Sequence, residues 1–266
     1  MHSVAELIAS VDAAFVETGR GLARWEDPHP DRRPSEEEYS RLTNPQKWRI
    51  LRARAEAWLK ALDTGGLAEI DPDAAVVWEE QPRADVVGVQ RASPRGSGAI
   101  PLTFAWTRFD GATGVVIGVG DPVVVVELVP DCGCDACDSG SQAVLDVLDE
   151  YVLGVVTGEY RRLRRGKREI TVSARDHLSW SGFERQWESL WRFVPSRDEL
   201  VPTGRSPRIK RKRPFRLPRA LLRYFASTRR DRQVQKALAR PKGWHEVSGS
   251  SWLDADNPQP WKASAC

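Results

Sequence analysis

Three of the four cysteines lie within six residues, in the segment Asp131-Cys132-Gly133-Cys134-Asp135-Ala136-Cys137-Asp138. Three thiolates in one tight loop can converge on a zinc ion, each at about 2.3 Å. The sequence has no second Cys-x-x-Cys pair, and Cys266 is its last residue, so the candidates for a fourth ligand are His177 or an aspartate. A metal site at Cys132, Cys134 and Cys137, with zinc as the candidate ion, is therefore one interpretation of this segment.

Two other interpretations of this segment stay open. Cys134 and Cys137 form a Cys-x-x-Cys pair near an expected helix N-terminus, where the helix dipole lowers a thiol pKa and favours redox chemistry. Against this, a thioredoxin-like site needs a strand-helix-strand setting that the surrounding sequence does not predict. In the plainest interpretation the segment is a connecting loop, in which the cysteines pack inward and Asp138 and Ser139 cap the next helix.

A basic segment is the second candidate for function. From Arg205 to Lys242 the chain has fifteen Lys and Arg residues against one acid, Asp231. Such a segment can neutralise nucleic-acid phosphates and release their counterions. It contains no helix-turn-helix, zinc-finger or single-strand-binding signature. Nucleic acid is therefore one candidate partner, and a solvated charged face or a contact with an acidic part of the same chain are the alternatives.

The net charge of +3 conceals an asymmetry that bears on this choice. Residues 1–160 contain 14 Lys and Arg against 27 Asp and Glu, whereas residues 161–266 contain 26 against 10. A division of charge this large indicates either charged partners or an attraction between the two halves.

Other functional classes find less support in the sequence. It contains no glycine-rich nucleotide loop, Walker motif, Gly-x-Ser-x-Gly elbow or His-Glu-x-x-His motif, and its four histidines are scattered. An enzyme is therefore not indicated, although catalytic groups can converge from distant positions. No stretch has the roughly twenty apolar residues of a membrane helix, and the cysteine spacing does not suggest secreted disulfides. We expect a non-catalytic, cytoplasmic binding protein without a membrane segment.

Several helices are expected around the cysteine segment. Ser3 can cap a first helix, and Asn44-Pro45 can start another, which Gly65-Gly66 would end. The second of these helices carries an apolar stripe that is typical of core: Trp48, Leu51, Ala55, Trp58, Leu59 and Leu62. A further helix is predicted from Ser139 or Ser141 to about Thr157. Its expected buried face comprises Val144, Leu145, Leu148, Tyr151, Val152 and Val155, while Asp146, Asp149 and Glu150 are expected on a solvated face.

Short runs rich in Val, Ile and Thr predict strands between these helices. They cover residues 74–80, 85–91, 101–108, 114–119 and 123–129, and tight turns separate several of them. Two more strands are expected at 159–163 and 168–173. The fold class is therefore α+β: N-terminal helices, an antiparallel β-meander sheet, one long helix packed on the sheet and a basic helical C-terminal extension. The predicted domains are a core over 1–194, a Pro/Arg-rich linker over 195–217 and the extension over 218–266.

Three segments together resemble an uncharacterised actinobacterial family, domain of unknown function 6226. They are Leu42-Thr43-Asn44-Pro45-Gln46-Lys47-Trp48, Pro130-Asp131-Cys132-Gly133-Cys134-Asp135-Ala136-Cys137-Asp138-Ser139-Gly140 and Gly243-Trp244-His245-Glu246-Val247. The resemblance spans most of the chain, and the cysteine segment is its most specific part. It implies a bacterial cytoplasmic protein and supplies no activity, cofactor or catalytic residue.

Overall fold

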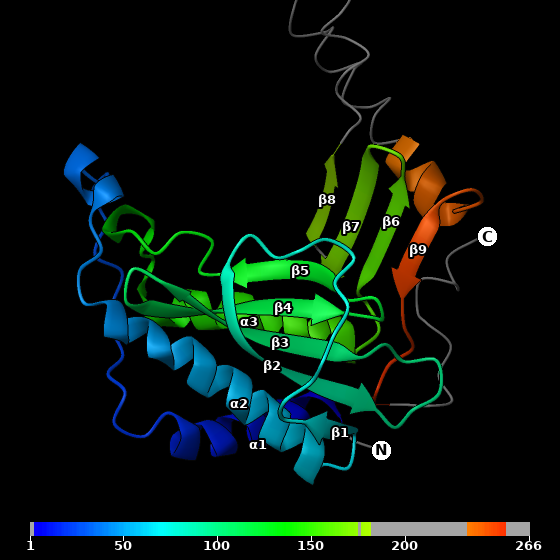
Figure 1. Ribbon diagram of the computed structural model, residues 1–266, viewed down its shortest axis with the longest axis horizontal. Coiled ribbons are helices and arrows are strands. Elements are labelled where there is room, and N and C mark those ends of the chain that lie inside the picture. The colour runs from blue at the N-terminus through cyan, green and yellow to red at the C-terminus, as the bar shows by residue number, and fades with distance from the viewer. Residues whose placement is uncertain (1–2, 175–176, 182–232, 254–266) are drawn as a thin grey trace, which may run out of the picture. The chain divides into compact units, whose positions relative to one another are not determined.

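The computed structural model describes residues 3–174, 177–181 and 233–253 (Figure 1). The chain forms two compact units. Among the described residues, the first comprises 3–161, 172–174, 177–178 and 247–253, and the second comprises 162–171, 179–181 and 233–246. The predicted fold class, α+β with an antiparallel sheet, is confirmed.

The first unit begins with two helices that pack on each other. Helix α1 (Val4–Thr18) starts at a capping box, in which Ser3 and Glu6 exchange hydrogen bonds between side chain and backbone. Two short 3-10 helices follow, η1 (Glu36–Ser40) and η2 (Pro45–Trp48), and η2 leads directly into α2 (Arg49–Thr64). All six residues of the predicted apolar stripe are buried, so their assignment to the core is confirmed.

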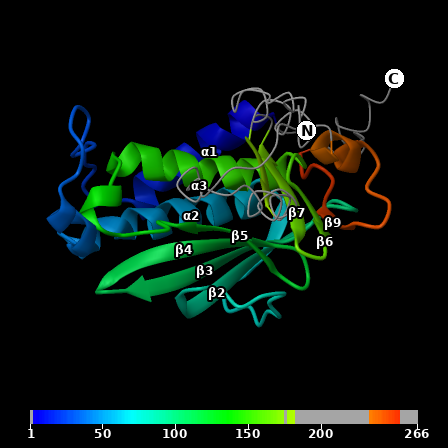
Figure 2. The same cartoon turned by 90° about the horizontal axis from the view of Figure 1, so that it is seen from above.

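A five-stranded antiparallel sheet forms the second layer of this unit. Its order follows the chain: β1 (Ala68–Asp71), β2 (Asp85–Pro94), β3 (Leu102–Phe109), β4 (Ala112–Val119) and β5 (Val124–Val129). The helices α1, α2 and α3 (Gly140–Val156) lie on one side of the sheet (Figure 2). Phe104, Val115 and Ile117 point into the core between the sheet and the helices.

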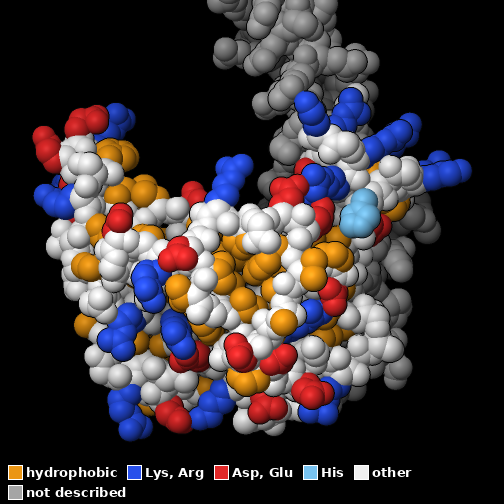
Figure 3. All heavy atoms as spheres, viewed as in Figure 1, with side chains coloured by type: hydrophobic (Ala, Val, Ile, Leu, Met, Phe, Trp, Pro, Cys, Tyr) orange, Lys and Arg blue, Asp and Glu red, His pale blue; other side chains and the backbone are white. Residues whose placement is uncertain are grey.

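The prediction of a strand at residues 74–80 is wrong, because this segment is not a strand of the sheet. It crosses the sheet face opposite the helices (Figures 1 and 2), and it meets the sheet through an isolated bridge between Trp78 and Val123. Its other anchor is the Ala74 amide, which donates to the Val89 carbonyl at 3.0 Å. Apolar side chains gather on this face (Figure 3), and Val77 is among the exposed ones. The run of strand-favouring residues predicted extended backbone but could not distinguish a crossing segment from a sheet strand.

The predicted face of α3 is buried in the core, with Tyr151 packed at its margin. For Asp149, by contrast, the expected solvated position is wrong. Its carboxylate accepts hydrogen bonds from Arg54 Nε and Nη2 at 2.9 and 2.6 Å, and from Trp58 Nε1 at 2.6 Å. Arg54 is itself buried, so this ion pair joins α3 to α2 inside the protein.

A second sheet has the order β8-β7-β6-β9. Its strands are β6 (Arg161–Arg165), β7 (Arg168–Ala174), β8 (His177–Ser181) and β9 (His245–Ser248). Residues 233–239 are helical. The predicted linker at 195–217 and most of the basic segment lie outside the described residues. In the described part of the chain, no helix is both long and apolar enough to cross a membrane.

Candidate metal centre

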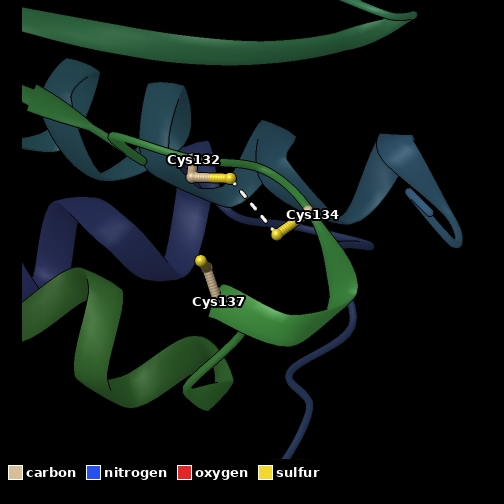
Figure 4. Close-up of side chains that lie close together, drawn as sticks. All are labelled: Cys132, Cys134 and Cys137. Atoms are coloured by element: carbon tan, nitrogen blue, oxygen red, sulfur yellow. Dashed lines mark hydrogen bonds between the residues drawn. The ribbon is translucent and has the colours of Figure 1, made fainter. Parts of the chain in front are cut away.

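The three clustered cysteines point toward one another from a single loop between β5 and α3 (Figure 4). Their sulfur atoms all lie within 4.8 Å of one another, and the Sγ atoms of Cys132 and Cys134 are 3.2 Å apart. All three are free thiols. Thiolates bound to one zinc ion at about 2.3 Å in a tetrahedron lie about 3.8 Å apart. The observed spacing brackets this value, so small movements of the side chains would bring three ligands onto one ion.

Cys134 and Cys137 differ in how readily they ionise. Although burial opposes ionisation of Cys134, hydrogen bonds from the Cys132 and Cys137 thiols and from the Cys137 and Ala136 amides lower its pKa. Hydrogen bonding to Cys134, together with burial, raises the pKa of Cys137 to about 12. Of these two thiols, Cys134 is therefore the first to become a thiolate, and a bound metal ion would displace the proton of Cys137.

Asp135 anchors the middle of the loop to the segment that precedes η2. Its carboxylate accepts hydrogen bonds from Arg41 Nε at 2.6 Å, the Thr43 amide at 2.7 Å and Thr43 Oγ1 at 2.6 Å. Its own amide donates to the Arg41 carbonyl at 2.8 Å. Burial opposes ionisation, but the bonds from Arg41 and Thr43 lower the pKa of Asp135 to about 2. Asp135 is therefore an anion that holds the backbone between Cys134 and Cys137.

Asp138 anchors the end of the loop in a similar way. One carboxylate oxygen accepts from Trp25 Nε1 at 2.8 Å and from the Gly140 amide at 3.0 Å, and the other accepts from Lys47 Nζ at 2.5 Å. The prediction that Asp138 caps the following helix is confirmed by the bond from Gly140. Ser139, which was expected to share this role, makes no side-chain capping bond.

Two glycines leave room for the loop. A Cβ on Gly133 would lie 2.1 Å from Cε2 of Phe109, so only glycine lets this aromatic ring pack on the backbone between Cys132 and Cys134. Gly140 has φ of +86°, and a Cβ there would lie 2.7 Å from the Asp27 nitrogen. A positive φ disfavours other residues, and the close approach adds a steric reason for glycine.

A second set of polar residues supports these anchors. Glu38 is buried and accepts two hydrogen bonds from Arg32, at 2.7 and 2.8 Å. His29 lies between Glu38 and the loop, with Nε2 3.1 Å from Glu38 Oε1 and Nδ1 3.4 Å from the Asp138 carbonyl. Both ring nitrogens thus face hydrogen-bond acceptors. The bonds from Arg32, the Ser35 amide and His29 lower the pKa of Glu38 well below its usual range.

Sequence reasoning missed most of these supporting residues, because their partners lie about 90 to 115 positions away in the chain. One signal was present. The segment Leu42–Trp48, which carried part of the family resemblance, supplies Thr43 to Asp135 and Lys47 to Asp138. Two of the three segments that carried the resemblance therefore meet at this site.

The arrangement favours metal binding over thioredoxin-like redox chemistry. The loop leads into α3, and the strands before and after that helix, β5 and β6, belong to different sheets, so they do not form the strand-helix-strand unit of that family. Among the described residues, no His, Asp or Glu ligand atom joins the three sulfurs. No described aspartate is therefore a candidate for the fourth ligand. The side chain of His177 lies outside the part that is described, so its role as a fourth ligand stays a prediction.

The fold and the loop define an α+β protein with a buttressed three-cysteine cluster. A family model described as "Family of unknown function (DUF6226)" matches residues 11–212, which is more than half of the chain. The chain therefore belongs to this family. No curated protein and no solved structure matches it.

Proposed function

We propose that this protein is a non-catalytic binding protein whose ligand is one zinc ion, held by Cys132, Cys134 and Cys137. The observation that carries the proposal is the convergence of three sulfur atoms within 4.8 Å on one loop. Thiolates are preferred zinc ligands, and zinc needs no redox partner to remain bound.

The surroundings of the loop support this proposal. Metal ligands are usually oriented by neighbouring groups that do not touch the metal. Here Asp135 and Asp138 alternate with the cysteines, and each is held by three hydrogen bonds. A loop that merely connected two elements would need neither three converging thiols nor this number of anchors.

The test is elemental analysis of the full-length protein purified under reducing conditions. We expect about one zinc ion per chain, and we expect Cys134→Ser to lose it, because that substitution removes one of the three ligands and the thiol whose pKa is lowered. Ser139→Ala is the matched control, since Ser139 lies on the same loop, is exposed and makes no capping bond. It should retain the metal.

Two results would contradict zinc binding. A metal-free protein whose three thiols all react freely with a thiol reagent would leave only the connecting-loop interpretation. Reversible formation of a Cys134–Cys137 disulfide, without any metal release, would favour the redox interpretation.

We further propose that the basic segment from Arg205 to Lys242 associates with nucleic acid, on the strength of its fifteen positive residues. Binding to generic duplex DNA should weaken steeply with salt, and it should weaken further when Lys210, Arg211, Lys212 and Arg213 are replaced by glutamine in the full-length protein. Filter binding or fluorescence anisotropy at two salt concentrations measures this. Equal binding by the wild type and the substituted protein would contradict the proposal.

The cellular setting and the domain division stay proposals as well. A reducing cytoplasm would keep the three thiols available for metal. We propose a core over 1–194, a linker over 195–217 and a basic extension over 218–266.

A further inference from the structure

The cysteine loop supplies three of the four ligands that a zinc ion usually has. In the part of the chain that the structure describes, the group consists of three sulfur atoms, whereas zinc is almost always four-coordinate. A closed structural site takes its fourth ligand from the protein, and an open site takes it from water or a small molecule. The residues around the loop decide between these two types.

The carboxylates of the loop are held away from the sulfurs. Asp135 is bonded to Arg41 and Thr43, and Asp138 to Trp25, Lys47 and the Gly140 amide. The Asp138 side chain is 4% exposed and that of Lys47 is 13% exposed. Turning Asp138 toward a metal would leave the buried Lys47 ammonium without its counter-ion, which is strongly unfavourable. Asp131, the third acid of the loop, is exposed and contributes no oxygen to the group.

The sulfurs are open to solvent. Cys132 and Cys137 are exposed and Cys134 is half-buried, although Asp135 and Asp138 beside them are buried. The protein thus surrounds the anchors of the loop and leaves the thiols accessible. A molecule arriving from solvent can therefore approach an ion bound at this loop from the side of the exposed Cys132 and Cys137.

We propose that an ion bound at Cys132, Cys134 and Cys137 takes its fourth ligand from outside the chain, and that a small-molecule thiol is the ligand that completes the site. This inference rests on the proposed zinc site. Water occupies the fourth position when no thiol is present. An incoming thiol loses its proton to solvent, its sulfur bonds to the ion and the water leaves, so that no atom changes oxidation state. A fourth thiolate suits an ion that three thiolates have already selected.

Cobalt substitution provides the test. The full-length protein is loaded with Co²⁺, and its thiolate-to-cobalt absorption is followed while glutathione is added. Because the number of thiolates rises from three to four, we expect the intensity of this band to increase by about one third. S-methylglutathione is the matched control, since it has the same size and charge but no thiol, and it should leave the band unchanged.

Two variants ask whether the chain supplies the fourth ligand itself. Cys266→Ser and His177→Gln should give the same cobalt spectrum as the wild type, with the same response to glutathione. If either variant changes the spectrum before thiol is added, the fourth ligand is internal and the inference is overturned. A cobalt band that does not respond to glutathione also overturns it while leaving the metal site intact. No cobalt binding at all would remove the site and the inference together.

Discussion

At the scale of single residues, acids and thiols have separate roles in the cysteine loop. The sequence alternates them, and a reader of the sequence could assign either kind to a metal. The structure divides them, because Asp135 and Asp138 bond to cationic and amide groups of the N-terminal segment while the thiols face one another. The aspartates therefore position the ligands and do not supply them.

Asp135→Asn tests this division of roles. The substitution keeps the shape of the side chain but replaces the charge-assisted bond from Arg41 by a weaker one. Loss of a group that orients metal ligands typically lowers metal affinity by about 10- to 100-fold. We expect zinc affinity to fall by at least about tenfold in a chelator competition assay. Asp131→Asn, on the same loop but exposed, should leave the affinity unchanged, and an equal loss in both variants would contradict the positioning role.

The lowered pKa of Asp135 also predicts that the stability of the fold depends on pH. The pKa of Asp135 is about 2 in the folded protein, whereas an unfolded aspartate has a pKa of about 3.9. A lowered pKa stabilises the fold above the unfolded value, and this contribution is lost as the pH falls through 4 toward about 2. Urea unfolding of the metal-free protein should show wild type more stable than Asp135→Asn at pH 6. The difference should narrow as the pH approaches about 3.

At the scale of elements, local sequence patterns predicted the helices and strands that depend on local interactions. The stripe on α2, the face of α3 and the meander from β2 to β5 follow from apolar periodicity and turn residues, and the structure has all three. The composition of residues 74–80 predicted a strand, because an extended segment that crosses a sheet can be as rich in strand-favouring residues as one within it. Whether Trp78 pairs in register or crosses depends on distant residues, such as Val123, that periodicity does not report.

The predicted solvated position of Asp149 was wrong for a related reason. The contacts of Asp149 also lead to a prediction on helix packing. Arg54 Nη1 also donates to Asp12 of α1 at 2.8 Å, so one buried guanidinium joins three helices. The Asp149 side chain is 18% exposed and that of Asp12 is 62% exposed. Removing a partner from a buried pair costs about 3 to 5 kcal/mol, whereas an exposed pair contributes about 1 kcal/mol or less.

We therefore expect Asp149→Ala to lower the free energy of unfolding by about 3 kcal/mol and Asp12→Ala by less than about 1 kcal/mol. Both variants lose a carboxylate that binds the same arginine, but only Asp149 is largely buried and also accepts a hydrogen bond from Trp58 Nε1, so the difference measures the buried part of the cluster. Chemical denaturation of the two proteins measures the difference. Similar losses would show that the Arg54 cluster is not the joint between α2 and α3.

At the scale of the whole molecule, the N-terminal core includes a residue from far along the chain. Trp252 is 5% exposed and belongs to the same core cluster as the α2 stripe. Its amide donates to the Val156 carbonyl at the end of α3 at 2.8 Å. Trp25 similarly connects the early chain to the cysteine loop. Trp252 therefore packs on the core through contacts that no local sequence pattern specifies.

Trp252→Ala tests whether this late residue completes the core. Deleting a buried tryptophan side chain costs about 3 to 5 kcal/mol, from lost apolar contact and from the cavity that remains. The indole Nε1 is buried and has no hydrogen-bond partner among the described residues, so Trp252→Phe loses contact area but no hydrogen bond. We expect the alanine variant to lose at least about 3 kcal/mol in chemical denaturation and the phenylalanine variant to lose clearly less. If both variants unfold at the wild-type midpoint, the end of the chain is an appendage, and the core of residues 3–161 is stable without it.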